Sequence, residues 1–460
     1  MEICAVVLAA GEGRRMKSKK AKVVHLAAGK PLIGWVREAL DQAGARDQVY
    51  VVGYAQDQVR QVLGEDVAFV IQEHQLGTGH AVLQAAPFLH ARDGATLVVS
   101  GDAPLVTGAT LRQALDLFER DQLAVLMLTA VTDDPTGYGR VLRDADGRVR
   151  GVVEERNATD EERRIREVKS SLYCFRTPLL LSALGRLGSG NAHGEIHLTD
   201  AVSLLIADGH RAGAFRVPFE EILSVNDRVL LQAAGSILNR RICQDHMRSG
   251  VTILDPGSTW IEAGVNIGPD TEILPGCHLS GQTTVGEDCR IGPNTRLVDM
   301  TVGSGVTLDN TVAVRSRIGD QTTVGPFAYI RPGSVIGAHC RIGDFVEVKN
   351  AVIGAHTTAA HLAYIGDADV GENVNYGCGC ITVNYDGLRK HRTTIGDNAF
   401  VGSNSNLVAP VTVEDNAYVA AGSTITDTVP AYAMAIARQR QVVKENWVVT
   451  RNRIRRPKSP

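Results

Sequence analysis

A six-residue spacing of aliphatic side chains after Gly250 is the feature that most constrains the fold of this 460-residue chain. Such a period is typical of a parallel β-helix, in which each hexapeptide forms one short strand and one turn. We expect the glycine that often follows the aliphatic residue to supply a turn conformation with positive φ. The sequence therefore predicts a left-handed parallel β-helix of hexapeptide repeats. The spaced residues are Ile267, Ile273, Leu279, Val285, Ile291 and Leu297; Ile318, Val324, Ile330, Ile336, Ile342 and Val348; and Ile395, Val401, Leu407, Val413, Val419 and Ile425.

The repeat is interrupted between Val383 and Thr394 by Asn-Tyr-Asp-Gly and a basic stretch. A β-helix that served only as a scaffold would not need this interruption. The flat faces of a β-helix are also suited to packing against neighbouring subunits. We therefore expect this part of the chain to assemble with further copies and to carry a site.

A different pattern fills residues 1–227, where short β-branched runs alternate with longer amphipathic stretches. This alternation predicts an α/β domain of Rossmann-like type, with a mostly parallel sheet covered by helices. Ligands of such sheets bind at the carboxyl ends of the strands. The segments that carry the pattern are Ile3 to Ala10, Leu32 to Ala43, Val49 to Val52, Gln56 to Leu63, Val67 to Gln72 and Leu97 to Ser100.

Between the two patterns, residues 228–248 read as one helix with an apolar stripe, suited to connecting two bodies. The chain is also longer than one hydrophobic core usually supports. We therefore expect one domain over 1–227, a linker helix over 228–248 and a β-helical domain with a C-terminal tail over 249–460.

The composition excludes several classes of partner. With 48 basic and 51 acidic residues the net charge is −3, which argues against nucleic acid and acidic membranes. We interpret the basic run from Arg451 to Lys458 as a solvated tail. The first ten residues lack a basic leader, and no segment is long enough to span a bilayer. The eight cysteines contain no CxxC pair, which favours reduced thiols in the cytoplasm.

Gly-rich turns follow several strands of the first domain. Leu8 to Met16 contains Gly11, Gly13 and Arg15 and is followed by Lys22, so backbone N–H groups and two cations can hold phosphates. In Gln72 to His80, Gln72 and Thr78 can read a base edge. Asp102 comes directly after a strand, where an oxygen ligand for a divalent cation is needed.

Polar residues also gather along the β-helix, more densely than a scaffold requires. Arginine and lysine near His361 create a pocket for an anion beside a candidate base. The gathered residues are Arg331, Glu347, Lys349, His361, Tyr364, Asn375 and the Asn384-Tyr385-Asp386-Gly387 segment.

In their order and spacing, these motifs resemble the sugar-1-phosphate nucleotidyltransferases. The likeness is greatest to the bifunctional N-acetylglucosamine-1-phosphate uridylyltransferases and glucosamine-1-phosphate N-acetyltransferases, and it runs nearly from end to end. The motifs that carry it are LAAGxGxRM at 8–16, QxxQLGTGHA at 72–81, GDxPL at 101–105, Asp134 to Arg140, Gly151 to Glu154, Val225-Asn226, HLxYIGD at 361–367 and NYDG at 384–387.

The resemblance implies uridylyl transfer from UTP to N-acetylglucosamine 1-phosphate in the first domain, with release of pyrophosphate. Arg15 would be catalytic, and Asp102 with Asn226 would bind Mg²⁺. The sugar would be positioned by Gly139 and Glu154. UTP and the product UDP-N-acetylglucosamine would contact Leu8, Ala9, Gly11, Lys22, Gln72, Gly77, Thr78, Gly139, Glu154 and Asn226.

For the β-helix the resemblance implies acetyl transfer from acetyl-CoA to glucosamine 1-phosphate, with His361 as the catalytic base. Asn384 would contact this sugar phosphate and also acetyl-CoA. A homotrimer is implied, and its product would feed peptidoglycan and lipopolysaccharide precursors. Glucosamine 1-phosphate would contact Arg331, Lys349, Tyr364 and Asn375, and acetyl-CoA would contact Cys378, Asn384, Tyr385, Ser403, Ala421 and Arg438.

Two positions depart from the family pattern. Lys169 stands where members usually carry asparagine, and Cys378 and Cys380 stand where they usually carry alanine and threonine. Two other hypotheses remain open from the residues themselves. One is a single-activity nucleotidyltransferase whose β-helix only forms trimers or regulates the enzyme, and the other is a non-enzymatic hexapeptide scaffold. The HLxYIGD and NYDG segments argue against both.

Overall fold

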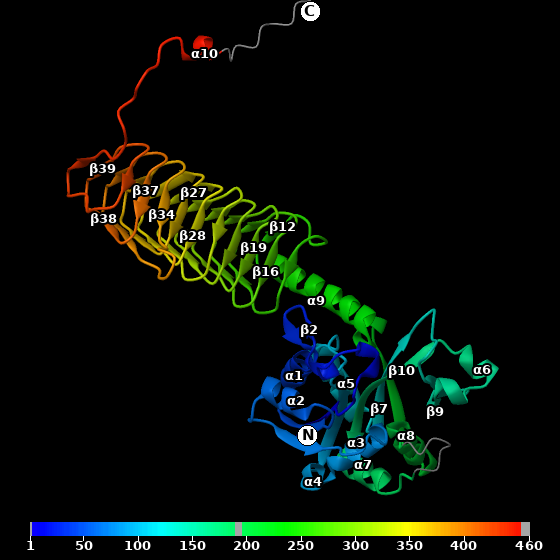
Figure 1. Ribbon diagram of the computed structural model, residues 1–460. Coiled ribbons are helices and arrows are strands. Elements are labelled where there is room, and N and C mark those ends of the chain that lie inside the picture. Colours follow the sequence, from blue (N-terminus) through cyan, green and yellow to red (C-terminus); the bar gives the residue numbers. More distant parts are fainter. Residues whose placement is uncertain (1, 189–195, 452–460) are drawn as a thin grey trace, which may run out of the picture. The chain divides into compact units, whose positions relative to one another are not determined.

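A computed structural model describes residues 2–188 and 196–451 and divides the chain into two compact units, residues 1–242 and 243–460. Figure 1 shows the first unit as a sheet with helices and the second as a stack of short strands. The division falls inside α9 (Arg228–Arg248), a continuous helix over the segment expected to connect the domains. No described helix is both long and apolar enough to cross a membrane.

The first unit is built on a nine-stranded sheet with the main strand order β11-β7-β10-β6-β1-β4-β5. All neighbours on this path are parallel except those of β10, which is antiparallel to both β6 and β7. The predicted α/β fold is therefore confirmed, but the sheet is mixed and not mostly parallel, because four of its strand pairings are parallel and four are antiparallel. The strands of the path are β1 (Glu2–Ala9), β4 (Asp47–Val52), β5 (Ala68–Ile71), β6 (Gly94–Ser100), β7 (Val125–Val131), β10 (Glu167–Arg176) and β11 (Ala212–Arg216).

Helices cover both faces because the side chains of β1 alternate between two cores. Ala5 and Val7 pack with α1 (Leu32–Ala43), α2 (Gln56–Leu63) and α5 (Gly108–Arg120). Cys4 and Val6 belong to the opposite core, which includes residues of α3 (Thr78–Gln84), α4 (Ala86–Leu89), α7 (Thr177–Leu184) and α8 (Leu198–Ala207). The remaining elements are short: η1 (Arg14–Met16), η2 (Lys22–Val24), β2 (Leu26–Ala27), β3 (Lys30–Pro31), η3 (Glu155–Asn157), α6 (Asp160–Arg163) and η4 (Phe219–Ile222).

A hairpin of β8 (Arg140–Arg143) and β9 (Val149–Val153) branches from β10 and is held by a buried carboxylate, Glu167. Arg143 donates to both oxygens of Glu167, at 2.8 and 2.6 Å. Arg216 donates at 2.8 Å and Thr129 at 3.0 Å. One side chain thus ties together β7, β8, β10 and β11.

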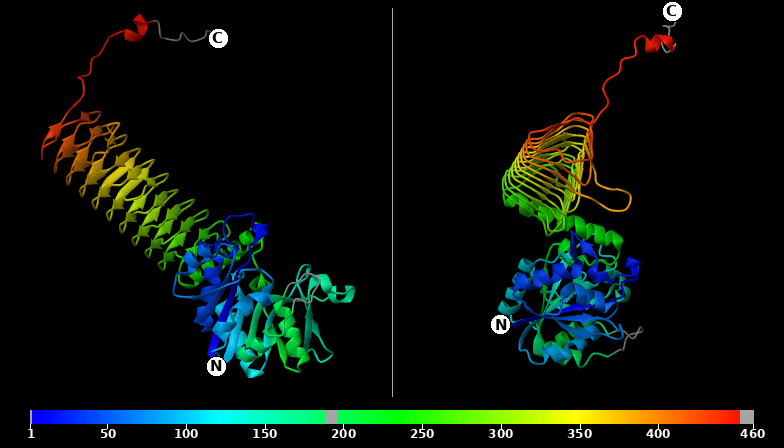
Figure 2. Two further views of the ribbon diagram at one scale, coloured as in Figure 1. Left: turned by 60° about the horizontal axis from the view of Figure 1, so that its bottom comes forward. Right: turned by 60° about the vertical axis from the view of Figure 1, so that its left-hand side comes forward.

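The second unit is a left-handed parallel β-helix, seen from another direction in Figure 2. Its strands form an 11-stranded sheet from β12 (Thr252–Ile253) to β41 (Met434–Ala435), a 10-stranded sheet from β13 (Trp260–Ile261) to β40 (Thr424–Ile425) and a 9-stranded sheet from β14 (Asn266–Ile267) to β38 (Val411–Val413). Successive coils pair in register, as Leu279 with Leu297 and Ile330 with Val348. The predicted β-helix is confirmed.

The three hexapeptide runs belong to one continuous prism. Strands also occupy the intervals between them, such as β20 (Thr301–Val302), β22 (Val312–Val314) and β29 (Val352–Ile353). There the inward residues Val302, Ala313 and Ile353 each follow the preceding inward residue after five positions instead of six. Shorter corners therefore hide the period without breaking the fold.

The expectation that glycines after the inward residues supply positive φ was wrong for most of them. It holds at Gly292 and Gly325, with φ of 112° and 103°. At Gly268 a Cβ atom would instead lie 2.7 Å from the backbone nitrogen of Glu287, and at Gly343 it would lie 1.7 Å from the carbonyl oxygen of Ala360. These glycines are needed because the next coil passes too close for any side chain.

The predicted interruption forms a loop over residues 384–392, between β34 (Ile381–Val383) and β35 (Thr393–Ile395). The loop leaves the prism (Figure 2, orange) and is closed by a bridge between Tyr385 and Lys390. Between β41 and residue 451, where the described part of the chain ends, α10 (Trp447–Thr450) is the only regular element, and the basic run lies outside the described residues except for Arg451.

Glu167→Gln should destabilise the first unit because it leaves Arg143 and Arg216 without their shared anion. We expect a loss of about 3 kcal/mol at pH 7, or roughly 6–12 °C in thermal midpoint. Burial alone would raise the pKa of Glu167, but the donors from Arg143, Arg216 and Thr129 lower it from 4.5 to about 2. The contribution is therefore complete above pH 4.5 and is lost as the pH falls toward 2.

Thermal unfolding followed by circular dichroism between pH 3 and 7 measures this effect. Glu161→Gln, at an exposed position of α6, is the matched control and should leave the midpoint unchanged. A midpoint difference between Glu167→Gln and the natural protein that stays constant from pH 7 to pH 3 would contradict the role given to this carboxylate.

Candidate active sites

The first site lies at the carboxyl ends of β1 and β6. These strands are parallel neighbours, and Leu8 pairs with Ser100. The loops that follow them, with Gly11 and Arg15 on one and Asp102 on the other, therefore open at the same edge of the sheet. Gly13 has φ 63°, and a Cβ atom there would lie 2.7 Å from Cβ of Lys22, so the loop closes tightly over that lysine.

Lys22 lies between two oxygen ligands at this edge. Its ammonium group contacts Asp102 Oδ2 in a short ion pair and donates to Asn226 Oδ1 at 3.2 Å. Ser100 donates to the other oxygen of Asp102 at 2.6 Å, and the N–H of Val225 donates to the carbonyl of Asp102 at 2.8 Å. A carboxylate and an amide oxygen that converge on one cation form a donor set that fits Mg²⁺.

A cavity of about 350 Å³ opens beside this cluster. Seven of the residues expected to hold the nucleotide line it together with Asp102: Leu8, Ala9, Gly11, Lys22, Gln72, Gly77 and Thr78. Gln72 is buried and donates to the carbonyl of Gly77 at 3.1 Å, and the hydroxyl of Thr78 accepts from the N–H of Leu198 at 3.1 Å. The second Gly-rich turn is thereby held against the start of α8.

A second cavity of about 430 Å³ contains the other predicted residues of this unit: Arg15, Asp102, Gly139, Glu154 and Asn226. Both cavities are lined by Ser100, Asp102 and Ser171. Two ligands bound in the two cavities would therefore meet at Asp102. All residues predicted for this unit line one cavity or both.

Lys169, the position that departs from the family pattern, also lines the second cavity. Its ammonium group lies 2.9 Å from Oε1 of Glu154. Burial alone would raise the pKa of Glu154, but Lys169 lowers it overall. The carboxylate thus stays ionised in a largely enclosed place.

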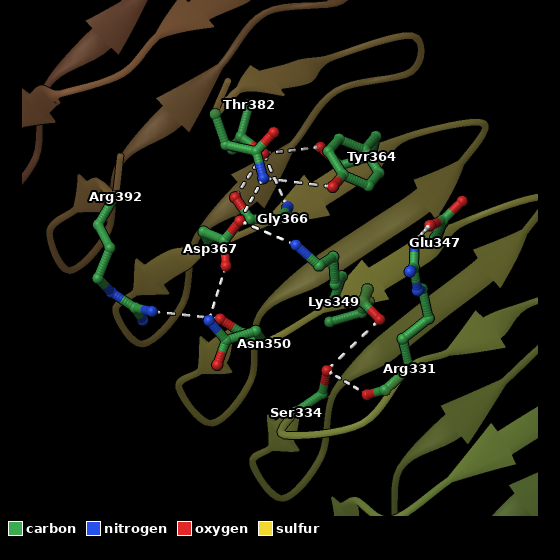
Figure 3. Close-up of polar contacts among 12 residues, drawn as sticks. Arg331, Ser334, Glu347, Lys349, Asn350, Tyr364, Gly366, Asp367, Thr382 and Arg392 are labelled. Carbon is green, nitrogen blue, oxygen red and sulfur yellow. Dashed lines mark hydrogen bonds and ion pairs between the residues drawn. The ribbon is translucent and has the colours of Figure 1, made fainter. Parts of the chain in front are cut away.

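The second site is a column of polar side chains on the 10-stranded sheet of the β-helix (Figure 3). The strands β25 (Tyr329–Ile330), β28 (Glu347–Lys349), β31 (Tyr364–Gly366) and β34 are consecutive neighbours in register. Residues that are one coil apart, which is 17 or 18 positions in the sequence, therefore lie one above another. Arg331 pairs with Glu347 at 2.8 Å, and Asn384 donates to the hydroxyl of Tyr364 at 3.3 Å.

Asp367 lies at the centre of this column and is buried. It accepts from Lys349 at 3.1 Å, from Asn350 at 2.6 Å and from Asn384 in a short hydrogen bond. Burial would raise the pKa of Asp367, but these three donors lower it overall. The carboxylate therefore fixes Lys349 and Asn384, two residues that sequence reasoning selected.

His361 and Asn375 lie on the 11-stranded sheet, in β30 (Thr358–His361) and β33 (Asn375–Tyr376). Nδ1 of His361 is 2.6 Å from Oδ1 of Asp344, which is directly opposite in β27 (Arg341–Asp344). The hydrogen bond to His361 lowers the pKa of Asp344. A carboxylate on one ring nitrogen orients the imidazole and leaves Nε2 available as a base.

The residues expected to bind acetyl-CoA continue from His361 along one corner of the prism. Backbone hydrogen bonds link Leu362 to Gly379, Cys378 to Asn404 and Ser403 to Gly422, so Cys378, Ser403 and Ala421 lie in successive coils. The Cδ atom of Arg438 lies 3.8 Å from the place that a Cβ atom would occupy at Gly422. Tyr385 instead lies in the 384–392 loop, where its hydroxyl donates to the carbonyl of Gly387 at 2.6 Å.

The two departing cysteines differ in position. Cys378 is exposed at the corner, whereas Cys380 is buried and donates to the carbonyl of Gly402 at 3.0 Å. Cys380 thus belongs to the wall of the prism.

Sequence reasoning missed Asp344 and the role of Asp367. Asp344 lies 17 residues before His361, which is one coil of the β-helix, so the repeat length itself would have pointed to it. Asp367 is part of the HLxYIGD motif but was not selected. Ser171 lies in both cavities of the first unit, and no feature of the sequence around it distinguishes it.

Comparison with known proteins gives matches over both units. Residues 5–168 match the MobA-like NTP transferase domain, residues 261–358 the GMPPB C-terminal domain, and residues 392–427 the bacterial transferase hexapeptide of six repeats. The chain is 50% identical to the "Bifunctional protein GlmU" of Acetivibrio thermocellus over 457 residues, covering 99% of each chain. It is 52% identical to the protein of the same description from Brevibacillus brevis over 447 residues, covering 97% of each.

Proposed function

The chain belongs to the family of bifunctional GlmU proteins, and on this premise we propose how its residues divide two reactions between the two units. It acetylates glucosamine 1-phosphate from acetyl-CoA. It then transfers a uridylyl group from UTP to N-acetylglucosamine 1-phosphate and releases pyrophosphate. Together these steps make UDP-N-acetylglucosamine for cell-wall synthesis.

The two cavities that meet at Asp102 carry the assignment of uridylyl transfer to the first unit. Gln72, Gly77 and Thr78 bind uracil and ribose in one cavity, and Gly139 and Glu154 bind the acetylamino sugar in the other. A sugar phosphate in the second cavity then faces the α-phosphate of a nucleotide in the first. In-line attack needs no covalent intermediate, so positioning supplies much of the catalysis.

Charge neutralisation supplies the rest. Arg15 and Lys22 hold phosphate oxygens, and Asp102 and Asn226 are the residues that would hold Mg²⁺. When bound, this ion neutralises charge on the triphosphate.

In the β-helix, His361 accepts a proton from the amine of glucosamine 1-phosphate as the amine nitrogen attacks the thioester carbonyl carbon. The bond from carbon to sulfur then breaks, and coenzyme A leaves as the thiol. Arg331, Lys349, Tyr364, Asn375 and Asn384 bind the sugar phosphate, and backbone N–H groups near Cys378 support the oxyanion. Acetyl-CoA lies along the corner formed by Cys378, Ser403, Ala421 and Arg438, with Tyr385 from the loop.

The hydrogen bond from His361 to Asp344 favours this assignment over a β-helix that only forms trimers. A scaffold has no need of an oriented imidazole one corner away from an anion-binding column. We place the boundary between the activities in the 228–248 helix and the protein in the cytoplasm, where UTP and acetyl-CoA are made.

The acetyltransferase works as a homotrimer in this proposal. Large apolar side chains are exposed on all three sheets of the prism, including Tyr329, Val352 and Phe400. Leu388, in the middle of the 384–392 loop, is 90% exposed. Exposed apolar surface of this extent favours packing against further copies, and cyclic symmetry closes such an assembly.

Assays of both reactions on two variants test the division of chemistry. Asp102→Ala should slow pyrophosphate release at least a hundredfold and leave thiol release from acetyl-CoA unchanged, because only the first site loses a ligand of the metal ion. His361→Ala should slow thiol release about a hundredfold or more and leave pyrophosphate release unchanged.

Asp66→Ala and His356→Ala are matched controls at exposed positions of the same units and should retain both activities. If either active-site substitution abolished both reactions in a folded protein, a single coupled site would replace this assignment.

Light scattering tests the assembly. The natural protein should have three times the 49.3 kDa mass of one chain. Leu388→Glu should shift the protein toward monomers and lower thiol release in parallel, because a charge would be buried between copies. Val229→Glu, at a 76% exposed position of α9, should do neither. A monomeric natural protein with full thiol release would refute the trimer.

A further inference from the structure

The ion pair between Lys169 and Glu154 is the feature of the first site that the reaction does not yet explain. Lys169 is in β10, where its N–H donates to the carbonyl of Gly139 at 2.9 Å. Glu154 directly follows β9 and lines the same cavity as Lys169. Only 16% of the Lys169 side chain and 29% of the Glu154 side chain are exposed.

The pair is held in one geometry by its surroundings. A Cβ atom at Gly139 would lie 2.7 Å from Cε and 3.1 Å from Cγ of Lys169, so the lysine stem lies flat on this glycine. Tyr173, which is buried, interacts with the same ammonium group. Lys169 therefore cannot swing freely into the cavity.

The donors to Glu154 meet one of its two oxygens. Lys169 lies 2.9 Å from Oε1, and the hydroxyl of Thr199 donates to Oε1 at 3.4 Å. Oε2 lies 3.2 Å from the place that a Cβ atom would occupy at Gly139, a glycine that lines the same cavity as Glu154. Within the described part of the chain no donor contacts Oε2, so this oxygen can accept a hydrogen bond from a sugar hydroxyl in the cavity that Glu154 lines.

We propose that Lys169 is a positioning residue for the sugar phosphate: it fixes Oε1 of Glu154, so that Oε2 is presented to a sugar hydroxyl as a charged acceptor. This rests on the proposed function, which places N-acetylglucosamine 1-phosphate in this cavity. The asparagine that family members usually carry at position 169 could donate a hydrogen bond to Glu154 but could not balance its charge. In this chain Lys169 does both.

Two kinetic signatures follow from this role. Without the lysine charge, Glu154 is less well oriented, so the KM for N-acetylglucosamine 1-phosphate rises while the KM for UTP does not. In addition, burial is then opposed by His197 and Thr199 without the lysine, so the pKa of Glu154 rises. The protonated fraction of the carboxylate, which is the poorer acceptor, therefore grows in the variant as the pH falls.

Lys169→Met tests the proposal because methionine keeps most of the stem and removes the charge. We expect the KM for N-acetylglucosamine 1-phosphate to rise roughly tenfold at pH 8, as for a lost hydrogen bond to a charged group. The KM for UTP should stay within about twofold. We then divide the sugar-phosphate KM of the variant by that of the natural protein at each pH. This ratio should increase as the pH is lowered from 8 to 6. Titration of the substrate phosphate affects both proteins equally and therefore cancels in the ratio.

Two further variants separate orientation from general damage. Lys169→Arg keeps the charge and should restore most of the lost affinity. The double variant Glu154→Gln with Lys169→Met has no carboxylate to titrate, so its KM ratio should not change with pH. If Lys169→Met fails to fold, Lys169→Gln takes its place, with a smaller rise in KM and the same pH trend.

Several outcomes would overturn the proposal: an unchanged sugar-phosphate KM, equal rises for both substrates, or a ratio independent of pH in Lys169→Met. In the same experiment, the kinetics of the natural protein with N-acetylglucosamine 1-phosphate test the proposed function itself. If it showed no saturable use of N-acetylglucosamine 1-phosphate, the proposed function would fail. If it did and Lys169→Met matched it, the positioning role alone would fail.

Discussion

In-register pairing of parallel strands is the constraint on which both candidate sites depend. In the first unit it places Leu8 beside Ser100, so two loops that are about 90 residues apart in sequence open at one edge. In the second unit it places Glu347 beside Tyr364 and Lys349 beside Gly366, so each coil adds one layer to a column of polar side chains. A shift by one residue would turn these side chains to the opposite face.

Charge compensation then determines the geometry within each site. Asp102, Glu154 and Asp367 each lie against a lysine, and Glu167 lies between two arginines. A buried carboxylate without such a partner would take up a proton, and would then be a poor ligand for a cation or acceptor for a sugar hydroxyl. The same pairs also orient the cations, so Lys22, Lys169 and Lys349 are held in place by groups with which they share a site.

Much of this could be predicted from the sequence because both folds have periodic signals. The six-residue spacing located the inward residues of the β-helix, and the helix boundaries at Leu32–Ala43 and Gln56–Leu63 agree with the predicted segments. The five-residue corners at Val302 and Ala313 removed that signal locally. The antiparallel direction of β10 could not be predicted, since a strand buried on both faces gives the same pattern in either direction.

Contacts between distant residues were the least predictable part of the sites. The motif around Asp102 suggested a cation ligand, but nothing in the sequence showed that Lys22, 80 positions earlier, contacts it. The pairing of Lys169 with Glu154 likewise arises only when β10 lies beside the hairpin. Substitutions at such positions change the chemistry of a site without altering any motif.

The central claim is that each unit carries one chemistry by itself, and a fragment ending at residue 248 tests it most directly. This fragment contains the first compact unit and all of α9. UDP-N-acetylglucosamine formation from UTP and N-acetylglucosamine 1-phosphate should proceed with a kcat within about twofold of the full chain, and no thiol should be released from acetyl-CoA. A folded fragment without uridylyl transfer, or one that still acetylates glucosamine 1-phosphate, would contradict the account.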